Sequence, residues 1–115
     1  MFFSIGTGWG TDVICPIYNS IGIEITALWG RNEEKTKKIS ENLKIPFYTS
    51  DFSKFLSYEN MDIIFIVTPP EIHLKMVTDA LTTTKKHVIC DKPPTLNLNE
   101  MKLMYNLSLV ILEII

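Results

Sequence analysis

The stretch FFSIGTGWGT, residues 2–11, joins an apolar, strand-forming segment directly to a glycine-rich turn, and apolar residues at helical spacing follow over residues 13–18. In a strand–turn–helix unit, Gly6 permits the tight turn, and Gly8 lets the backbone approach a pyrophosphate that faces the helix amides. Glycines also mark ordinary turns, and Thr11 stands where the usual pattern has its third glycine. The flanking strand and helix favour a dinucleotide-binding loop, formed by Gly6, Thr7, Gly8, Trp9 and Gly10.

Strand-like and helix-like segments alternate along the rest of the chain. Residues rich in Ile, Val, Phe and Tyr predict five strands, at 2–5, 23–28, 46–49, 62–67 and 87–90. Apolar stripes predict helices between them, and a capping box of Asn97 and Glu100 predicts a last helix, with Met101, Met104 and Tyr105 on one face. Because parallel strands need crossover helices, this order predicts an α/β fold with a doubly wound parallel sheet. Pro16 should kink the first helix or move its start.

Composition excludes several classes of protein. The chain has 115 residues, 46% of them hydrophobic, and a net charge of −2, which fits one globular domain without the basic face that a nucleic-acid partner requires. Cys15 and Cys90 lie in apolar stretches without metal-ligand spacing, so we expect reduced thiols, no metal and a cytoplasmic setting. The start lacks the features of a signal peptide. The closing run LSLVILEII is shorter than the roughly 20 apolar residues of a membrane span, so no membrane partner is expected.

The end of the second predicted strand bears on the choice between NAD and NADP. In a dinucleotide fold, an acidic residue there binds the ribose hydroxyls, whereas arginine accommodates a 2′-phosphate. Here Gly30, Arg31 and Asn32 occupy the place of the acid, and Lys35 follows one helical turn later. The sequence therefore favours NADP, with Arg31 as the phosphate ligand. In the alternative, Arg31 is a solvated surface charge, and Glu33 or Glu34 serves the ribose of NAD.

The end of the fourth predicted strand reads VTPPEIH, residues 67–73. Ligands bind at the carboxyl ends of strands in open parallel sheets, so Thr68, Pro69 and His73 are candidates for the ribose and nicotinamide side of a cofactor. Helix initiation alone would also explain the two prolines. A histidine at the start of a helix is commonly a surface or capping residue, and that alternative stays open.

The segment CDKPP, residues 90–94, places a carboxylate and an ammonium directly after the fifth predicted strand. Because proline has no N–H, the strand cannot continue its hydrogen bonding beyond Pro93. Asp91 and Lys92 are therefore expected at the mouth of the sheet, which suits a ligand site. An Asp–Lys pair that caps the strand end is the structural alternative.

Together, the segments GTGWGT, ALWGR, VTPPEIH and KHVICDKPP resemble the N-terminal nucleotide-binding domain of the Gfo/Idh/MocA oxidoreductase family. That family shows a GxGxx(A/G) loop, a TPxxxH stretch and a GKHVxxEKP segment in the same order. The stretch ALWGRNEEKTKKISENLKIPFYTS is similar to the animal members called glucose-fructose oxidoreductase domain-containing proteins. The resemblance runs from residue 2 to about 105 and implies a Rossmann-type sheet.

The resemblance also implies a role for residues after the last strand. Lys92 matches the lysine of the family's EKP segment, which contacts the nicotinamide ribose and the substrate and is implicated in catalysis. Asp91 and Pro93 match its acid and proline, so all three are expected at the cofactor. The implied activity is oxidation of CH–OH groups in sugar- or polyol-like substrates, with NADP or, in the alternative, NAD. Residues 84–86 replace a glycine of the pattern, which predicts an altered turn into the fifth strand.

Family enzymes carry a second, α+β domain that covers the nicotinamide, and this sequence contains no counterpart of it. Residues 1–115 are therefore expected to form a truncated nucleotide-binding domain, without the last sheet strand and the substrate domain, and to lack catalytic activity by themselves. Two alternatives remain: a catalytically inert nucleotide-sensing or interaction module, and a non-functional fragment. In such a chain the apolar C-terminal segment would be exposed and would favour self-association.

Overall fold

The computed structural model describes residues 2–5, 15–91 and 94–111. Five strands form one sheet in which every neighbouring pair is parallel, in the order β3-β2-β1-β4-β5. The strands are β1 (Phe2–Ile5), β2 (Ile25–Trp29), β3 (Phe47–Thr49), β4 (Ile63–Ile66) and β5 (His87–Cys90). The predicted α/β class and parallel doubly wound sheet are confirmed, with strand limits displaced by at most two residues.

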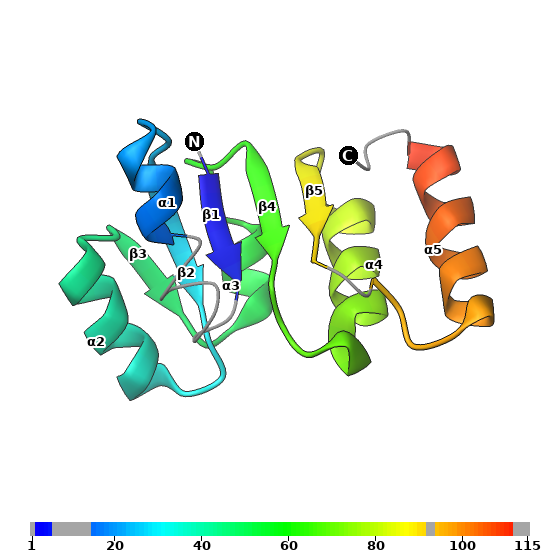
Figure 1. Cartoon of the computed structure of the whole chain (residues 1–115), viewed down its shortest axis with the longest axis horizontal. Coiled ribbons are helices and arrows are strands. Elements are labelled where there is room, and N and C mark those ends of the chain that lie inside the picture. Colours follow the sequence, from blue (N-terminus) through cyan, green and yellow to red (C-terminus); the bar gives the residue numbers. More distant parts are fainter. Residues whose placement is uncertain (1, 6–14, 92–93, 112–115) are drawn as a thin grey trace.

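The strand order creates a switch point beside β1. From β1 the chain moves outward to β2 and β3, and it then returns to place β4 on the other side of β1. Connections that leave neighbouring strands in opposite directions open a crevice at the carboxyl ends of those strands. In Figure 1 all five arrows point toward the lower edge of the sheet, which we call the carboxyl edge.

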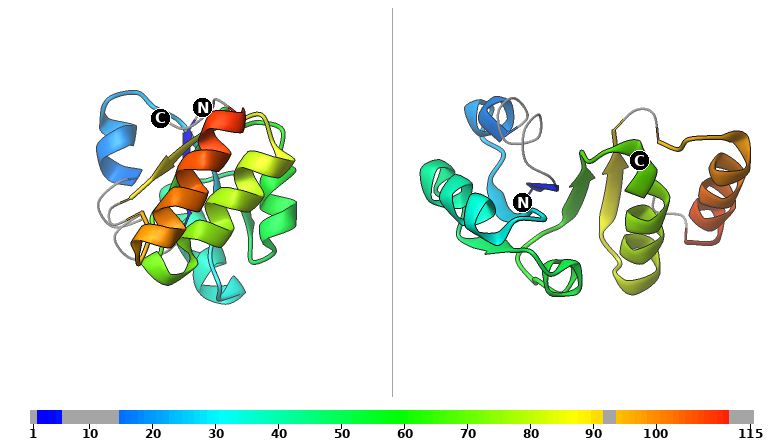
Figure 2. Two further views of the ribbon diagram at one scale, coloured as in Figure 1. Left: turned by 90° about the vertical axis from the view of Figure 1, so that its right-hand side faces the viewer. Right: turned by 90° about the horizontal axis from the view of Figure 1, so that it is seen from below.

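Helices cover both faces of the sheet. They are α1 (Cys15–Ser20), α2 (Glu33–Leu43), α3 (Phe52–Leu56), the 3-10 helix η2 (Pro70–Ile72), α4 (His73–Thr83) and α5 (Leu98–Ile111). Figure 2 shows α1 and α2 on one face and α3 and α4 on the other, while α5 packs chiefly against α4. Pro16 lies in the first described turn of α1, where proline is tolerated; residues 13 and 14 of the predicted stripe lie outside the described residues.

The core lies between the sheet and the helices that cover it, with a large share beneath α3 and α4. In β4, Ile64 and Ile66 are fully buried, as the uninterrupted apolar run predicted for a strand covered on both faces. The sequence also predicted an apolar helical stripe of Ile72, Met76, Val77, Ala80 and Leu81. The last four are buried in α4, whereas Ile72 is half-buried and belongs to η2. This packing fixes the first turn of α4 against the end of β4, where candidate site residues lie.

The start of α5 is capped close to the predicted pattern. The Asn97 side chain accepts from the Glu100 amide at 2.9 Å, and the Glu100 carboxylate accepts from the Leu96 amide at 3.0 Å. The glutamate thus bonds the residue before the cap rather than the cap itself. Of the three residues expected on one face, Met104 is buried, whereas Met101 and Tyr105 are exposed. Within the described ranges, no helix has the length and apolar character needed to cross a bilayer.

Candidate functional site

The site is built from segments that follow β2 and β4, the two strands that flank β1. Parallel strands end at the same edge of a sheet, so residues far apart in sequence meet there. The predicted glycine loop, Gly6 to Gly10, lies outside the described residues, as do Lys92 and Pro93. The predictions that can be placed are those for Gly30, Arg31, Thr68, Pro69, His73 and Asp91.

A pocket of about 280 Å³ lies between the ends of β2 and β4. We call it the strand-end pocket; it is lined by Trp29, Gly30, Arg31, Asn32, Lys35, Val67, Thr68 and Pro69. Four of the predicted site residues therefore share one pocket: Gly30, Arg31, Thr68 and Pro69. The sequence interpretation did not assign Trp29, Asn32 and Val67 to the site, although their positions directly beside the motif residues at the strand ends could have indicated them.

Two hydrogen bonds hold the β2 side of the pocket. The Gly30 amide donates to the Thr49 carbonyl at 3.3 Å, which extends the pairing of β2 with β3 by one residue. The Asn32 side chain then caps α2 by accepting from the Lys35 amide at 2.9 Å. Only one residue, Arg31, separates the strand extension from the cap. The pocket wall is therefore a short, fixed turn rather than a long loop.

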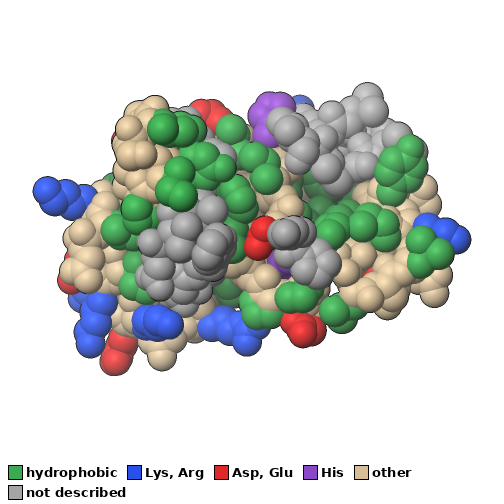
Figure 3. Space-filling view, viewed as in Figure 1, with side chains coloured by type: hydrophobic (Ala, Val, Ile, Leu, Met, Phe, Trp, Pro, Cys, Tyr) green, Lys and Arg blue, Asp and Glu red, His purple; other side chains and the backbone are tan. Residues whose placement is uncertain are grey.

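The pocket carries positive charge. Arg31 and Lys35 are exposed, and neither side chain forms an ion pair or hydrogen bond within the part of the chain that the structure describes. Glu33 and Glu34 lie in the first turn of α2 but not among the described residues that line the pocket. Figure 3 shows Lys and Arg side chains gathered over α2 and the segment before it. These two cations are therefore available to an anionic ligand.

An adjoining cavity of about 510 Å³ shares Trp29 and Arg31 with the strand-end pocket. Its apolar walls come from Trp29, Phe52, Ile72 and Met76. The indole N–H of Trp29 donates to the Ser50 carbonyl at 3.1 Å, and the ring meets Phe52 edge-on with centroids 5.7 Å apart. A planar, largely apolar group would fit beside these rings.

His73 and Asp91 lie differently from the pocket-lining residues. His73 is only 1% exposed, and its Nε2 lies 2.6 Å from the Thr68 carbonyl oxygen. Asp91 is partly buried, and its amide donates to the Ile66 carbonyl at 2.9 Å, which continues the pairing of β5 with β4. A direct cofactor contact by either residue stays a prediction.

The thiol next to Asp91 is shielded. Burial, together with the nearby Asp91 carboxylate, raises the pKa of the Cys90 thiol to about 12. A thiol with such a pKa is protonated at neutral pH and is a poor nucleophile and metal ligand. Within the described ranges, no group of three or more His, Cys, Asp and Glu residues could hold a metal ion.

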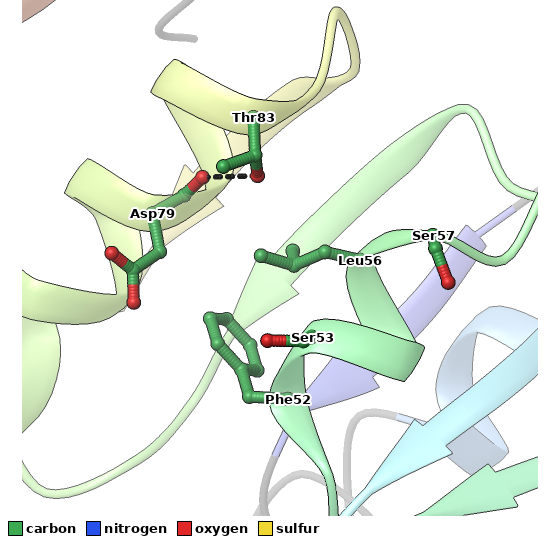
Figure 4. A pocket seen from close by; sticks show the side chains of 6 residues that line it. All are labelled: Phe52, Ser53, Leu56, Ser57, Asp79 and Thr83. Carbon is green, nitrogen blue, oxygen red and sulfur yellow. Dashed lines mark hydrogen bonds between the residues drawn. The ribbon is translucent and has the colours of Figure 1, made fainter.

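A third cavity, of about 300 Å³, lies between α3 and α4 (Figure 4). It is lined by Phe52, Ser53, Leu56, Ser57, Asp79 and Thr83. The Thr83 hydroxyl donates to the Asp79 carbonyl. This bond lies within α4 and is a common local contact of helical threonines, so it does not indicate a ligand site. None of the predicted site residues lines this cavity, so we place the candidate site at the carboxyl edge.

Comparison with known sequences identifies the family of the chain. The family model described as "Oxidoreductase family, NAD-binding Rossmann fold", named GFO_IDH_MocA, matches residues 2–108. Human glucose-fructose oxidoreductase domain-containing protein 2 is 34% identical over 90 residues, which are 78% of this chain and 23% of that protein. Its Xenopus laevis counterpart is 36% identical over 87 residues, 76% of this chain and 22% of that protein. The chain thus spans about a quarter of the length of these relatives.

Solved structures share the fold. Biliverdin reductase from Synechocystis, solved with biliverdin and NADP+, has a TM-score of 0.85 at 18% identity and covers 98% of this chain and 35% of its own. Levoglucosan dehydrogenase, solved with NADH and levoglucosan, has a TM-score of 0.79 at 19% identity. The match covers 93% of this chain and 32% of the dehydrogenase chain. The two structures carry different nicotinamide cofactors, so they do not distinguish NAD from NADP. With a family match over nearly its whole length, the chain belongs to the Gfo/Idh/MocA oxidoreductase family, whose NAD(P)-binding Rossmann fold it adopts.

Proposed function

We propose that this chain binds a nicotinamide dinucleotide at the carboxyl edge, NADP in preference to NAD, as the cofactor-binding part of an oxidoreductase. The proposed reaction is oxidation or reduction at CH–OH groups of sugar- or polyol-like substrates. One observation carries the cofactor preference: Arg31 and Lys35 both line the strand-end pocket and are not paired with any described residue.

A 2′-phosphate suits this pair of cations. The planar guanidinium of arginine bonds phosphate oxygens in a two-pronged arrangement, and a nearby lysine adds a point charge. An NAD site would instead favour a carboxylate that accepts from the ribose hydroxyls. The acids closest in sequence, Glu33 and Glu34, are not among the described residues of the pocket wall. The residues present therefore fit NADP better.

The adjoining cavity supports the same orientation of the dinucleotide. It meets the strand-end pocket at Trp29 and Arg31, so a base held against the aromatic walls would have its ribose phosphate beside the guanidinium. Thr68 and Pro69 then bound the path toward the nicotinamide end. The glycine loop, Gly6 to Gly10, would bind the pyrophosphate, and Asp91, Lys92 and Pro93 would lie at the nicotinamide.

The cofactor, when bound, donates or accepts a hydride; the protein orients it and the substrate. We assign to Lys92 the contact with the nicotinamide ribose and the substrate, and thus the catalytic role. Selection of a substrate is assigned to further residues, because the chain spans 23% of the human relative. The chain alone is then expected to bind the cofactor without turning over a substrate.

Titration with NADPH and NADH, followed by cofactor fluorescence, tests the cofactor proposal. Arg31→Ala should raise the Kd for NADPH by roughly tenfold to a hundredfold, because a charge-assisted phosphate contact is lost, and should change the Kd for NADH by less than about twofold. Lys38→Ala is the matched control, since Lys38 is an exposed cation of α2 that does not line the pocket. An unchanged NADPH preference in Arg31→Ala would refute the phosphate role.

A panel of sugars and polyols tests the catalytic assignment. We expect no cofactor reduction by this chain alone. Cofactor-dependent oxidation that disappears in Lys92→Ala would confirm the role of Lys92 and contradict the expected lack of turnover. Turnover that survives the substitution would remove Lys92 from the catalytic assignment.

A further inference from the structure

His73 is a buried histidine with a bond to the wall of the proposed cofactor site. It is the first residue of α4 and is 1% exposed. Its Nε2 lies 2.6 Å from the Thr68 carbonyl oxygen. A carbonyl oxygen can only accept, so Nε2 must carry the proton and donate it. The contact therefore defines the tautomer of the ring as well as the position of the carbonyl.

The segment that this bond holds has few other ways to be fixed. Thr68 is followed by Pro69 and Pro70, which have no amide hydrogen, so two consecutive backbone donors are absent. The Thr68 side chain makes a second, weaker contact with α4, from its hydroxyl to the Met76 sulfur at 3.5 Å. The carbonyl and the side chain of Thr68 are thus both bonded to α4, and the stronger of the two hydrogen bonds is the one with His73.

The same segment forms one wall of the strand-end pocket. Thr68 and Pro69 line the pocket opposite Arg31, whereas His73 is not among the described residues that line it. We propose that His73 is a positioning residue: its Nε2–H bond to the Thr68 carbonyl sets residues 68 and 69 at the spacing from Arg31 that the dinucleotide requires. This inference rests on the proposed function, because it assigns a role at the same site.

The physical reason is that binding sites depend on wall positions held to within a fraction of an ångström. A buried carbonyl without a donor favours movement of its segment toward water. Small displacements of a positioning group reduce function by factors of ten to about a hundred, even when no ligand contact is removed. Loss of the His73 bond should therefore weaken cofactor binding while the sheet and α4 stay folded.

Two substitutions separate the bond from the space that the ring fills. His73→Gln keeps a donor at a reach similar to that of Nε2, and His73→Met fills the buried space without a donor. We expect the Kd for NADPH to rise about tenfold in the methionine variant and to stay within about threefold of wild type in the glutamine variant. Equal affinities in the two variants, whether both normal or both weak, would overturn the proposal.

Two measurements without cofactor make the test independent of the proposed function. Nitrogen-15 spectra of the wild-type imidazole should show a protonated Nε2, and an unprotonated Nε2 would overturn the proposal. Exchange of the Ile72 amide, which donates to the Pro69 carbonyl at 3.2 Å, should be about tenfold faster in the methionine variant than in the glutamine variant. Equal exchange rates would overturn the role of the bond in holding the segment.

The outcomes distinguish the two proposals. If wild type binds neither NADPH nor NADH, the proposed function fails, and the proposal for His73 at that site fails with it, while the exchange data still show whether the bond holds the segment. If wild type binds NADPH and the methionine variant binds it equally well, only the role of His73 fails. If the methionine variant does not fold, the wild-type tautomer and the affinity of the glutamine variant decide: an unprotonated Nε2, or a tenfold loss in the glutamine variant, overturns the proposal.

Discussion

The two edges of the sheet both carry basic side chains, and the fold uses them in opposite ways. At the carboxyl edge, Arg31 and Lys35 are exposed and unpaired within the described residues. At the amino edge, just before β5, Lys86 is partly buried, and its Nζ donates to the carbonyls of Leu56 at 3.2 Å and Tyr58 at 2.6 Å. A cation with its donors already occupied stabilises the fold, whereas a cation without partners is available to a ligand.

The charge and the position of a residue therefore do not identify it as a binding residue unless its hydrogen-bond partners are also known. Lys86 donates to the carbonyl of the last α3 residue, Leu56, and to that of Tyr58 just beyond the helix, in the way that cations commonly stabilise helix C-termini. The acids nearby, Asp62 and Glu59, reinforce the local charge balance. Within the described residues, Arg31 has no such hydrogen-bond partner, although Asp51 and Asp79 line the adjoining cavity with it. Experiments on Cys90, Lys86 and Lys35 test the comparison, in order of decreasing effect.

Cys90 tests whether position at the carboxyl edge is enough to make a group available. It ends β5, yet burial and the Asp91 carboxylate raise the pKa of its thiol from 9.0 to about 12. Three pKa units reduce the thiolate fraction at pH 8 by a factor of about a thousand. In a Cys15→Ser background, iodoacetamide should therefore alkylate Cys90 at least about a hundredfold more slowly in the folded chain than in urea. Similar rates in the folded chain and in urea would show that a group at the carboxyl edge is accessible because of its position alone.

The same shift predicts a pH dependence of stability. The unfolded chain releases the thiol proton near pH 9.0, and the folded chain releases it near pH 12. Between these values the folded chain binds more protons, so the contribution of Cys90 to stability is complete below pH 9 and decreases as the pH rises. A Cys90→Ala variant should therefore lose less free energy of unfolding than wild type as the pH rises from about 8.5 to about 10.5, across the lower part of this range. A larger loss in the variant would reverse the assigned direction.

Lys86→Met tests the amino edge. The substitution leaves two carbonyl groups without their charged donor, so we expect the free energy of unfolding in urea to fall by about 1–2 kcal/mol, with the NADPH affinity unchanged. Lys85→Met is the matched control, because Lys85 is the exposed neighbour. Arg31→Ala should show the reverse pattern, with weaker NADPH binding and normal stability. If Lys86→Met weakened NADPH binding without destabilising the chain, the distinction between the edges would be wrong.

The stability difference between wild type and Lys86→Met should change with pH in a defined direction. Burial lowers the pKa of the Lys86 ammonium below 10.5, although Asp62 and Glu59 act in the opposite direction. Between the lowered pKa and 10.5 the unfolded chain binds more protons, so the contribution of Lys86 to stability increases as the pH rises through that range. The gap between wild type and Lys86→Met should therefore widen toward pH 10.5. A gap that narrows would contradict a burial-dominated shift.

General rules of parallel sheets predicted from the sequence which candidate residues lie at one edge of the sheet. Gly30 and Arg31 after one strand, and Thr68 and Pro69 after another, had to meet once the strand order was known, and they share a pocket. The hydrogen-bond partners of side chains could not be predicted from these rules. Lys85 and Lys86 are adjacent residues of the same type, and nothing in the sequence indicates that the carbonyls of Leu56 and Tyr58, far earlier in the chain, accept from Lys86.

Side-chain burial at helix surfaces was equally hard to predict. The spacing of Met101, Met104 and Tyr105 places them near one another on α5, yet only Met104 is buried against the core. The line along which α5 contacts α4 separates them, and helical periodicity gives the width of an apolar stripe but not the position of that line. His73 is a similar case, because its partner, the Thr68 carbonyl, is a backbone group that no sequence pattern reports.

Lys35→Ala gives the smallest expected effect and the finest test of the comparison. Lys35 lines the strand-end pocket but is exposed, so its attraction to a 2′-phosphate is weakened by solvent, and we expect the Kd for NADPH to rise only about twofold to threefold. Screening should remove this difference at about 0.5 M salt, where the Debye length is only a few ångströms. The loss in Arg31→Ala should persist there in part, because a two-pronged hydrogen bond depends on geometry as well as charge. If Lys35→Ala and Arg31→Ala gave equal losses that salt removed equally, the pocket would attract phosphate by charge alone, and Arg31 would have no specific ligand geometry.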